Sequence, residues 1–360
     1  MKYKLSVLLV LLILLTGCVS APGKTTVPSA EPTVTEHPSY FEVHYLDVGQ
    51  ADATLIVCDG EYLLLDGGTS SASSLNYSYL QNLKADRLKY IICTHVHEDH
   101  VGGLAGALNY AAVETVYCPA EEADLEEFRN FRKYLDRQNI SITVPSPGTE
   151  FSLGSAECTI LAVNTLPEDP NNSSIVLKVQ YGRTAFLFSG DAEAPAEQLI
   201  LESGADISCT VLKVPHHGSH TSLSEQWLAS ARPTYAVISC GEQNIYDHPH
   251  PVTLEKLRAA DVTLFRTDLQ GHIICRSDGS RVRFTTEKNS DADTYFLPAP
   301  PETDPIAEDT TYILNVNSMI FHEISCSSCS KISEKNRCQT SLSRDELIAQ
   351  GFSPCGSCRP

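Results

Sequence analysis

The stretch Thr94-His95-Val96-His97-Glu98-Asp99-His100 decides the fold of this 360-residue chain, because it places three histidines and an aspartate within six residues. It follows the apolar run 90–93, which predicts a buried strand that ends where the polar residues begin. Alternate side chains of an extended segment point to one side, so three of these residues would converge there, and the last would follow as the chain bends. Histidine and aspartate are ligands of divalent metals, so the stretch predicts a site for one or two ions.

The first 38 residues are expected to lie outside the folded domains. A short basic start, an apolar run at 7–15 and the sequence Leu15-Thr16-Gly17-Cys18 resemble a bacterial lipoprotein signal with its lipobox. By that resemblance, residues 1–18 direct export, and a lipid on Cys18 tethers the mature protein to the outer face of the cytoplasmic membrane. The alternatives are an ordinary secretory signal and an uncleaved anchor, which also export the protein. Residues 19–38, rich in Pro, Thr and Ser, predict a flexible stalk.

A proline-rich linker at 288–310 divides the rest into a large domain at 39–287 and a small module at 311–360. The formal net charge of −19 argues against a basic surface for tight, nonspecific binding of nucleic acid. It does not exclude a nuclease, because bound divalent cations reverse the sign locally. Seven of the 13 cysteines lie in the large domain, mostly in apolar strands, and are expected to be small buried side chains.

The order of elements in the large domain predicts an α+β fold. Strand-type runs come first, and helical patterns then alternate with further strands near 102–110, 123–138, 194–203, 222–230 and 252–260. That order favours two sheets packed face to face with helices outside.

Several predicted strands end in polar, potentially reactive residues. Asp66 follows one strand, Ser189-Gly190-Asp191 follows another, and His216-His217 follows a third. A carboxylate or imidazole at the end of a strand is held by rigid backbone while it faces a cleft. Each segment alone also fits an ordinary turn, but together with the histidine stretch they indicate one site.

These residues resemble the motifs of the metallo-β-lactamase superfamily, whose αββα sandwich holds one or two metals. The closer resemblance, over about residues 40 to 285, is to the extracellular hydrolase domain of ComEC-type competence proteins. It rests on the segments Val48-Gly49-Gln50-Ala51-Asp52, Asn171-Asn172-Ser173-Ser174, Phe188-Ser189-Gly190-Asp191, Leu212 to Ser219 and Asp247-His248-Pro249. Ala51 stands where the family usually has glycine.

The resemblance implies two adjacent metal sites, for zinc or manganese, that share one ligand. The ligands would be His95 and His97 in the first site, Asp99 and His100 in the second, Asp191 as the bridge, and His216, or else His217, completing the second. Many superfamily members use another histidine between the first motif and the bridging aspartate, but no histidine occurs from Val101 to Pro215. Asn171 or Asn172 occupies that region, so the first metal would be held more weakly, and occupancy by a single metal stays open.

The resemblance also implies the reaction, which is hydrolysis of phosphodiesters such as extracellular DNA by a metal-bound hydroxide. The catalytic candidates are Asp99, His217 and His248, and the other residues expected to line the site are Gln50, Asp52, Asp66, Asn171 and Asn172. The first alternative is an esterase of cell-wall phosphorylcholine or teichoic acid, or another hydrolase of this fold. The second is a non-catalytic surface lipoprotein that captures DNA. No protein partner is inferred.

The sequence of the C-terminal module predicts a structural zinc ion, because so short a segment cannot easily form a stabilising core. Cys355-Gly356-Ser357-Cys358 offers two ligands, and the region of Cys326 offers the others. The module resembles the zinc-binding domain of Ada-type DNA alkylation-repair proteins, in which the first ligand is a methyl-accepting cysteine. His322 takes that position here, so methyl transfer to sulfur is not expected. The ligands would be His322, Cys326, Cys355 and Cys358; the alternatives are Cys329 in place of His322, or disulfides without metal.

Overall fold

A computed structural model describes residues 40–296, 311–358 and 360. The predicted signal, lipidated Cys18, stalk and most of the linker therefore lie outside the described residues. Among the described residues, no helix combines the length and apolar character needed to cross a membrane.

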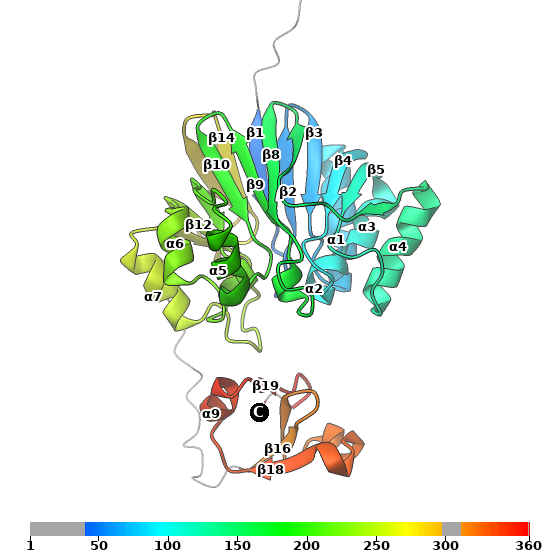
Figure 1. Ribbon diagram of the computed structural model, residues 1–360, viewed down its shortest axis with the longest axis vertical. Helices are drawn as coiled ribbons and strands as arrows, with labels where there is room; N and C mark the ends of the chain where they lie inside the picture. Colours follow the sequence, from blue (N-terminus) through cyan, green and yellow to red (C-terminus); the bar gives the residue numbers. More distant parts are fainter. Residues whose placement is uncertain (1–39, 297–310, 359) are drawn as a thin grey trace, which may run out of the picture. The chain divides into compact units, whose positions relative to one another are not determined.

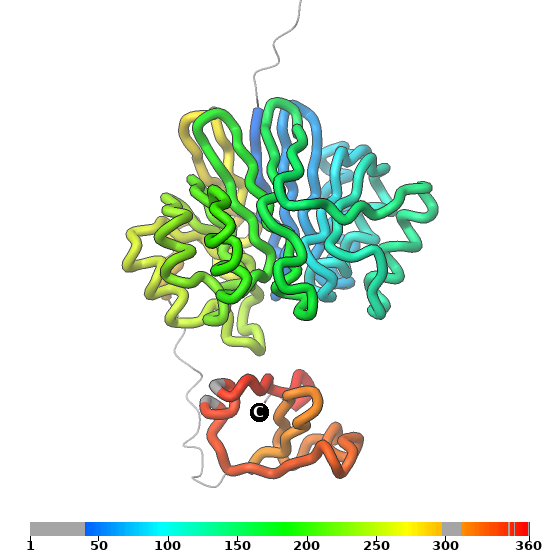
Figure 2. The backbone as a smooth tube through the Cα atoms, viewed as in Figure 1, coloured from blue at the N-terminus to red at the C-terminus, as the bar shows by residue number. Residues whose placement is uncertain are grey.

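Two sheets form the centre of the large domain (Figure 1). The first has the order β15-β14-β1-β2-β3-β4-β5-β6. Its strands are β1 (Phe41–Tyr45), β2 (Thr54–Cys58), β3 (Glu61–Leu65), β4 (Arg87–Ile92), β5 (Ala112–Tyr117), β6 (Ile142–Thr143), β14 (Ile273–Ser277) and β15 (Val282–Thr286). Strand β1 pairs with β14, so the two ends of the domain lie side by side, as the chain trace in Figure 2 shows.

The second sheet has the order β13-β12-β11-β10-β9-β8-β7. Its strands are β7 (Thr149–Leu153), β8 (Ala156–Ala162), β9 (Val176–Tyr181), β10 (Thr184–Phe188), β11 (Val211–Lys213), β12 (Tyr235–Ile238) and β13 (Thr263–Arg266). Strands β3 to β6 run parallel in the first sheet, and β10 to β13 run parallel in the second. The carboxyl ends of parallel strands meet at one edge of a sheet, which is where ligands bind in such folds.

Neighbouring residues of one strand pack in different apolar cores, which shows how the sheets and helices are layered. Ile56 and Phe186 pack between the two sheets, whereas Leu55 and Leu187 face outward. Leu55 packs in a cluster with residues of α3 and α4, and Leu187 packs in a cluster with residues of α5, α6 and α7. This is the predicted αββα sandwich, with helices on both outer faces (Figure 1).

The helices are α1 (Ser73–Leu83), α2 (Glu98–Val101), α3 (Leu104–Tyr110), α4 (Glu126–Gln138), α5 (Ala194–Glu202), α6 (Glu225–Ala231), α7 (Pro251–Ala259) and α8 (Thr267–Gln270). All seven cysteines of this domain are free thiols, and six of them are buried.

The C-terminal module has its own small sheet in the order β18-β16-β17-β19. Its elements are β16 (Tyr312–Asn315), β17 (Ile320–Glu323), β18 (Arg337–Thr340), α9 (Arg344–Ala349) and β19 (Ser353–Pro354). One small core contains Phe321 and Leu347, and a second gathers Ile313 with three cysteines. So little apolar area agrees with the expectation that a metal stabilises the module.

The histidine stretch is held against the end of β3 by close backbone contact. The amide of Gly67 donates to the carbonyl of His100 at 2.7 Å, and the amide of Gly103 donates to the carbonyl of Gly68 at 2.8 Å. The side chain of Asn76 donates to the carbonyls of Gly67 (2.7 Å) and Gly103 (3.1 Å). A Cβ atom at Gly103 would lie 1.9 Å from the oxygen of Gly67, so only glycine allows this approach.

We therefore expect Gly103→Ala to lower the free energy of unfolding by about 1–3 kcal/mol, because the added methyl group forces the two segments apart. The matched control is Gly204→Ala, where φ is +79° but a Cβ atom would meet nothing within 4 Å. Its cost should be limited to left-handed strain of about 1 kcal/mol. Urea unfolding curves of the two variants measure the difference, and equal midpoints would contradict the packing argument.

Candidate metal centre

Four side chains from both halves of the sandwich converge at the carboxyl ends of the parallel strands. Asp99 and His100 lie in α2 just after β4, Asp191 follows β10, and His217 lies in a 3-10 turn after β11. One ligand atom of each lies within 4.8 Å of the others. His100 Nε2 is 3.3 Å from Asp191 Oδ2, and His217 Nε2 is 3.2 Å from Asp99 Oδ2 and 3.6 Å from Asp191 Oδ2. This group has the donors of a divalent metal site.

Of the other two histidines of the stretch, His95 lies beside the same aspartate, and His97 lies beside His95. His95 Nε2 is 3.1 Å from His97 Nδ1 and 3.9 Å from Asp191 Oδ2. His95 is buried, whereas His97 is only half-buried. Asp191 thus lies in the group with Asp99, His100 and His217, the second set of ligands, and is also near His95, which in turn contacts His97.

The electrostatics of the second set fit a cation. Burial alone would raise the pKa of Asp191, but His100, His217 and His216 outweigh it and hold that pKa well below the usual range. Burial alone would lower the pKa of His217, but Asp191 and Asp52 raise it to about 10. Among the described residues, Asp191 Oδ1 and His100 Nε2 are buried without a hydrogen-bond partner. A divalent ion would satisfy both atoms and offset the carboxylate charge.

Asp66 orients one of these imidazoles. Its carboxylate accepts from the amide and the hydroxyl of Thr94, both at 2.7 Å, and lies 2.9 Å from His100 Nδ1. The proton of His100 is therefore on Nδ1, and Nε2 is left to face the metal centre. Asp66 therefore contacts the group through His100.

Asp52 and Lys213 form a buried ion pair behind His217. Lys213 Nζ donates to Asp52 Oδ2 at 2.9 Å, and both side chains are nearly inaccessible to solvent. His217 Nδ1 lies 3.0 Å from the carbonyl oxygen of Ser239 and 3.5 Å from Asp52 Oδ1. Sequence reasoning gave Lys213 no role, although a lysine in the apolar run Val211 to Val214 was a usable signal. A further compact group consists of Asp52, Asp66 and His100. Lys213, which contacts Asp52, already offsets negative charge in this group.

The expectation for the His216-His217 pair is revised, because His217 rather than His216 joins the second set. Both residues have left-handed backbone, with φ of 50° and 53°, so the alternation of a strand does not apply to them. His216 instead places Nδ1 3.4 Å from Glu193 Oε1, with Nε2 3.7 Å from Asp191 Oδ2. Both ring nitrogens of His217 are engaged, Nδ1 with the carbonyl of Ser239 and Nε2 with Asp99, so neither is left to give a proton to a leaving group. Glu193 was also missed, since nothing in its local sequence marks it.

The two asparagines differ in their contacts. Asn172 Oδ1 accepts from the amide of Glu193 at 3.0 Å, and its Nδ2 donates to Asp169 at 2.8 Å. Asn172 therefore supports the turn before α5. Asn171 keeps a buried Oδ1 without a hydrogen-bond partner among the described residues.

His248 lies beside the metal-ligand group. Its ring is stacked against that of His217, with centroids 6.2 Å apart and an interplanar angle of 26°. Burial, with a contribution from His217, lowers the pKa of His248 to about 2. Gln50, also expected to line the site, contacts His248 Nδ1 through Nε2 at 3.1 Å. His220 and His250 pair with each other, and His272 accepts from the amide of Asp47, so none of these three belongs to the group.

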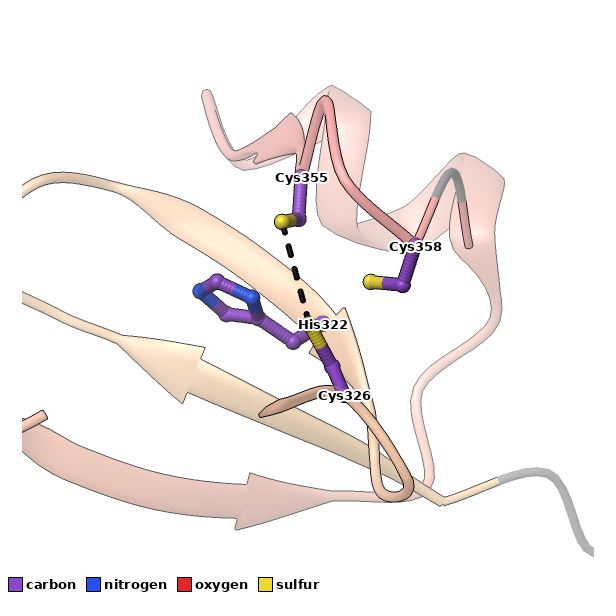
Figure 3. Close-up of side chains that lie close together, drawn as sticks. All are labelled: His322, Cys326, Cys355 and Cys358. Carbon is purple, nitrogen blue, oxygen red and sulfur yellow. Dashed lines mark hydrogen bonds between the residues drawn. The ribbon is translucent and has the colours of Figure 1, made fainter. Parts of the chain in front are cut away.

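A second cluster lies in the C-terminal module. His322, Cys326, Cys355 and Cys358 each offer a ligand atom within 4.8 Å of the others, and their side chains point toward one another in Figure 3. His322 Nδ1 is buried without a partner among the described residues, and the His322 side chain lowers the pKa of the Cys326 thiol to about 6. Cys329 instead directs its thiol to the carbonyl of Glu323. All these cysteines are free, and the set fits zinc.

Comparison with known proteins bears on the large domain. The family model described as "Metallo-beta-lactamase superfamily" matches residues 46–242. "ComE operon protein 3" of Bacillus subtilis (strain 168) is 28% identical over 251 residues, covering 64% of this chain and 32% of that protein. "Recombination protein 2" of Haemophilus influenzae is 32% identical over 239 residues, covering 65% of this chain and 28% of that protein. The chain thus spans about a third of the length of these curated relatives.

Among solved structures, the metallo-β-lactamase fold protein YhfI from Bacillus subtilis aligns with a TM-score of 0.47 and 12% identity, covering 66% of this chain and all of that one. The family match covers more than half of the chain and includes the histidine stretch, Asp191 and His217. The chain therefore belongs to the metallo-β-lactamase superfamily, and its large domain has that fold with a candidate metal-ligand group at the sheet edge.

Proposed function

We propose that this protein is an exported, membrane-tethered phosphodiesterase that hydrolyses extracellular DNA or related phosphodiesters. The observation that carries the proposal is the position of Asp191, which lies near His95 on one side of the centre and near His100 and His217 in the metal-ligand group. Two adjacent metal positions sharing one carboxylate suit an in-line displacement at phosphorus. The name of one curated relative, "Recombination protein 2", refers to recombination and supports DNA as the substrate.

The side chains around the centre have separable tasks in this proposal. Bound divalent ions would lower the pKa of an attacking water and offset charge on the phosphoryl oxygens. Asp66 holds the imidazole of His100, and the Asp52–Lys213 pair supports the turn that carries His217. His248 has its ring at the edge of the group, where it can contact a bound substrate.

The location outside the membrane rests on the N-terminal sequence pattern. The basic start, apolar run and Cys18 indicate a lipid anchor on an exported protein. A tethered hydrolase would meet phosphodiesters at the cell surface. With a net charge of −19, the chain would depend on its metal ions to attract a polyanion.

We expect Asp191→Asn to reduce turnover of bis-nitrophenyl phosphate about 1000-fold, because loss of the shared carboxylate removes several kcal/mol of charge stabilisation. The metal content, measured by elemental analysis, should fall with it. Asp136→Asn, an exposed change in α4, is the matched control and should leave both values unchanged.

The same preparations should be assayed with single- and double-stranded DNA, a phosphorylcholine ester and a β-lactam. Turnover of DNA that is lost in Asp191→Asn supports the proposal. Turnover of only the phosphorylcholine ester would favour a cell-wall esterase, and equal activity of Asp191→Asn and Asp136→Asn would overturn the metal-dependent mechanism. DNA binding without any hydrolysis would identify a capture protein.

We further propose one structural zinc ion in the C-terminal module. His322→Ala should then remove one zinc ion per chain and leave phosphodiester turnover intact, because the ligands belong to a separate module. Cys329→Ala is the control and should keep the full zinc content, since its thiol contacts a backbone carbonyl. His322→Cys should also keep it, because thiolate and imidazole both bind zinc. Loss of zinc in Cys329→Ala, or no loss in His322→Ala, would contradict this ligand set.

A further inference from the structure

Gln50 is the side-chain hydrogen-bond partner of the His248 ring. Gln50 Nε2 lies 3.1 Å from His248 Nδ1. The same amide accepts, through Oε1, the backbone N–H of Gly241 at 3.1 Å. Because a backbone N–H can only donate, the amide oxygen must face Gly241 and the amide nitrogen must face His248.

This orientation fixes the tautomer of His248. The amide nitrogen carries only donor hydrogens, so His248 Nδ1 has to be the acceptor and the ring proton has to be on Nε2. Among the described residues, no hydrogen bond to His248 Nε2 occurs, so this N–H is available to a ligand.

The backbone contacts of the loop keep the arrangement in place. The amide of His248 donates to Asn244 Oδ1 at 3.0 Å, and the ring of Tyr246 is stacked on that of His248 at 5.7 Å. A Cβ atom at Gly241 would lie 2.7 Å from the backbone nitrogen of Gln50, so the two loops are in close contact. Rotation of the His248 ring would break the contact with Gln50 and two ring stacks.

We propose that Gln50 is a positioning residue that holds His248 as an Nε2–H donor to a non-bridging oxygen of the phosphodiester. The proposal rests on the proposed function for its substrate. It differs from a role in which His248 gives a proton to the leaving oxygen. Here the proton stays on Nε2, and the hydrogen bond strengthens as negative charge gathers on the phosphoryl oxygens.

Nitrogen-15 NMR of the zinc-loaded full chain tests the tautomer without any activity measurement. The signals of His248 are assigned by their loss in His248→Asn. We expect the wild-type protein to carry its proton on Nε2. In Gln50→Glu, which still accepts from Gly241 but presents a carboxylate to Nδ1, the proton should move to Nδ1 at about pH 9, well above the ordinary histidine pKa. Gln243→Glu adds the same charge at an exposed position of the loop that carries His248, and it should leave the signals unchanged.

Kinetics then test the role of the donor. Gln50→Glu should lower kcat about 100-fold for phosphodiesters with good and with poor leaving groups alike, with metal content unchanged. Gln243→Glu should stay within about twofold of the wild type.

A wild-type proton on Nδ1, or a tautomer and kcat that do not change in Gln50→Glu, would overturn the positioning role. A loss of kcat that grows with the basicity of the leaving group would overturn the assignment to a non-bridging oxygen. Absence of phosphodiester turnover in the wild type would contradict the proposed function, and the nitrogen spectra would still decide whether Gln50 sets the tautomer.

Discussion

The buried carboxylate of Asp66 is the contact on which the metal centre depends. It joins the end of β3 to the backbone and hydroxyl of Thr94 after β4, and to the imidazole of His100 in α2. Three segments thereby take fixed positions around one charged group that is itself cut off from solvent. Burial raises the pKa of Asp66, and the contact with His100 works against that rise. A carboxylate so placed is stable only with its partners, so the histidine stretch and the sheet edge constrain each other.

The histidines that follow β11 also have supporting side chains. Lys213 and Asp52 stand behind His217, and Glu193 stands beside His216. Such contacts fix which ring nitrogen faces the metal and hold the ring in one orientation. The left-handed turn at the two histidines then directs their neighbouring rings to different partners. His217 joins the second set, and His216 lies beside Glu193.

Periodicity and local motifs were enough to predict most of the fold. The helical patterns expected at 123–138 and 194–203 correspond to α4 and α5, and in α4 the buried residues Phe128, Phe131 and Leu135 follow the helical repeat. Helix α1 was not predicted: it is rich in Ser, Asn and Tyr and buries only Asn76 and Leu80. The density of ligand-type residues at 95–100 marked the site. Local sequence patterns did not predict the roles of Lys213 and Glu193 or the choice of His217 over His216. These depend on contacts between distant segments and on left-handed turns, which such patterns do not encode.

The ligands of the second set come from both sheets, with Asp99 and His100 following β4 and Asp191 and His217 following β10 and β11. A bound ion is therefore a cross-link between the two halves of the sandwich, and neither half can unfold without releasing it. Binding free energy becomes folding free energy, about 2.7 kcal/mol when the free metal concentration is one hundred times its dissociation constant. Under the proposed export and hydrolysis, the supply of metal would thus set the lifetime of the protein against proteases as well as its rate.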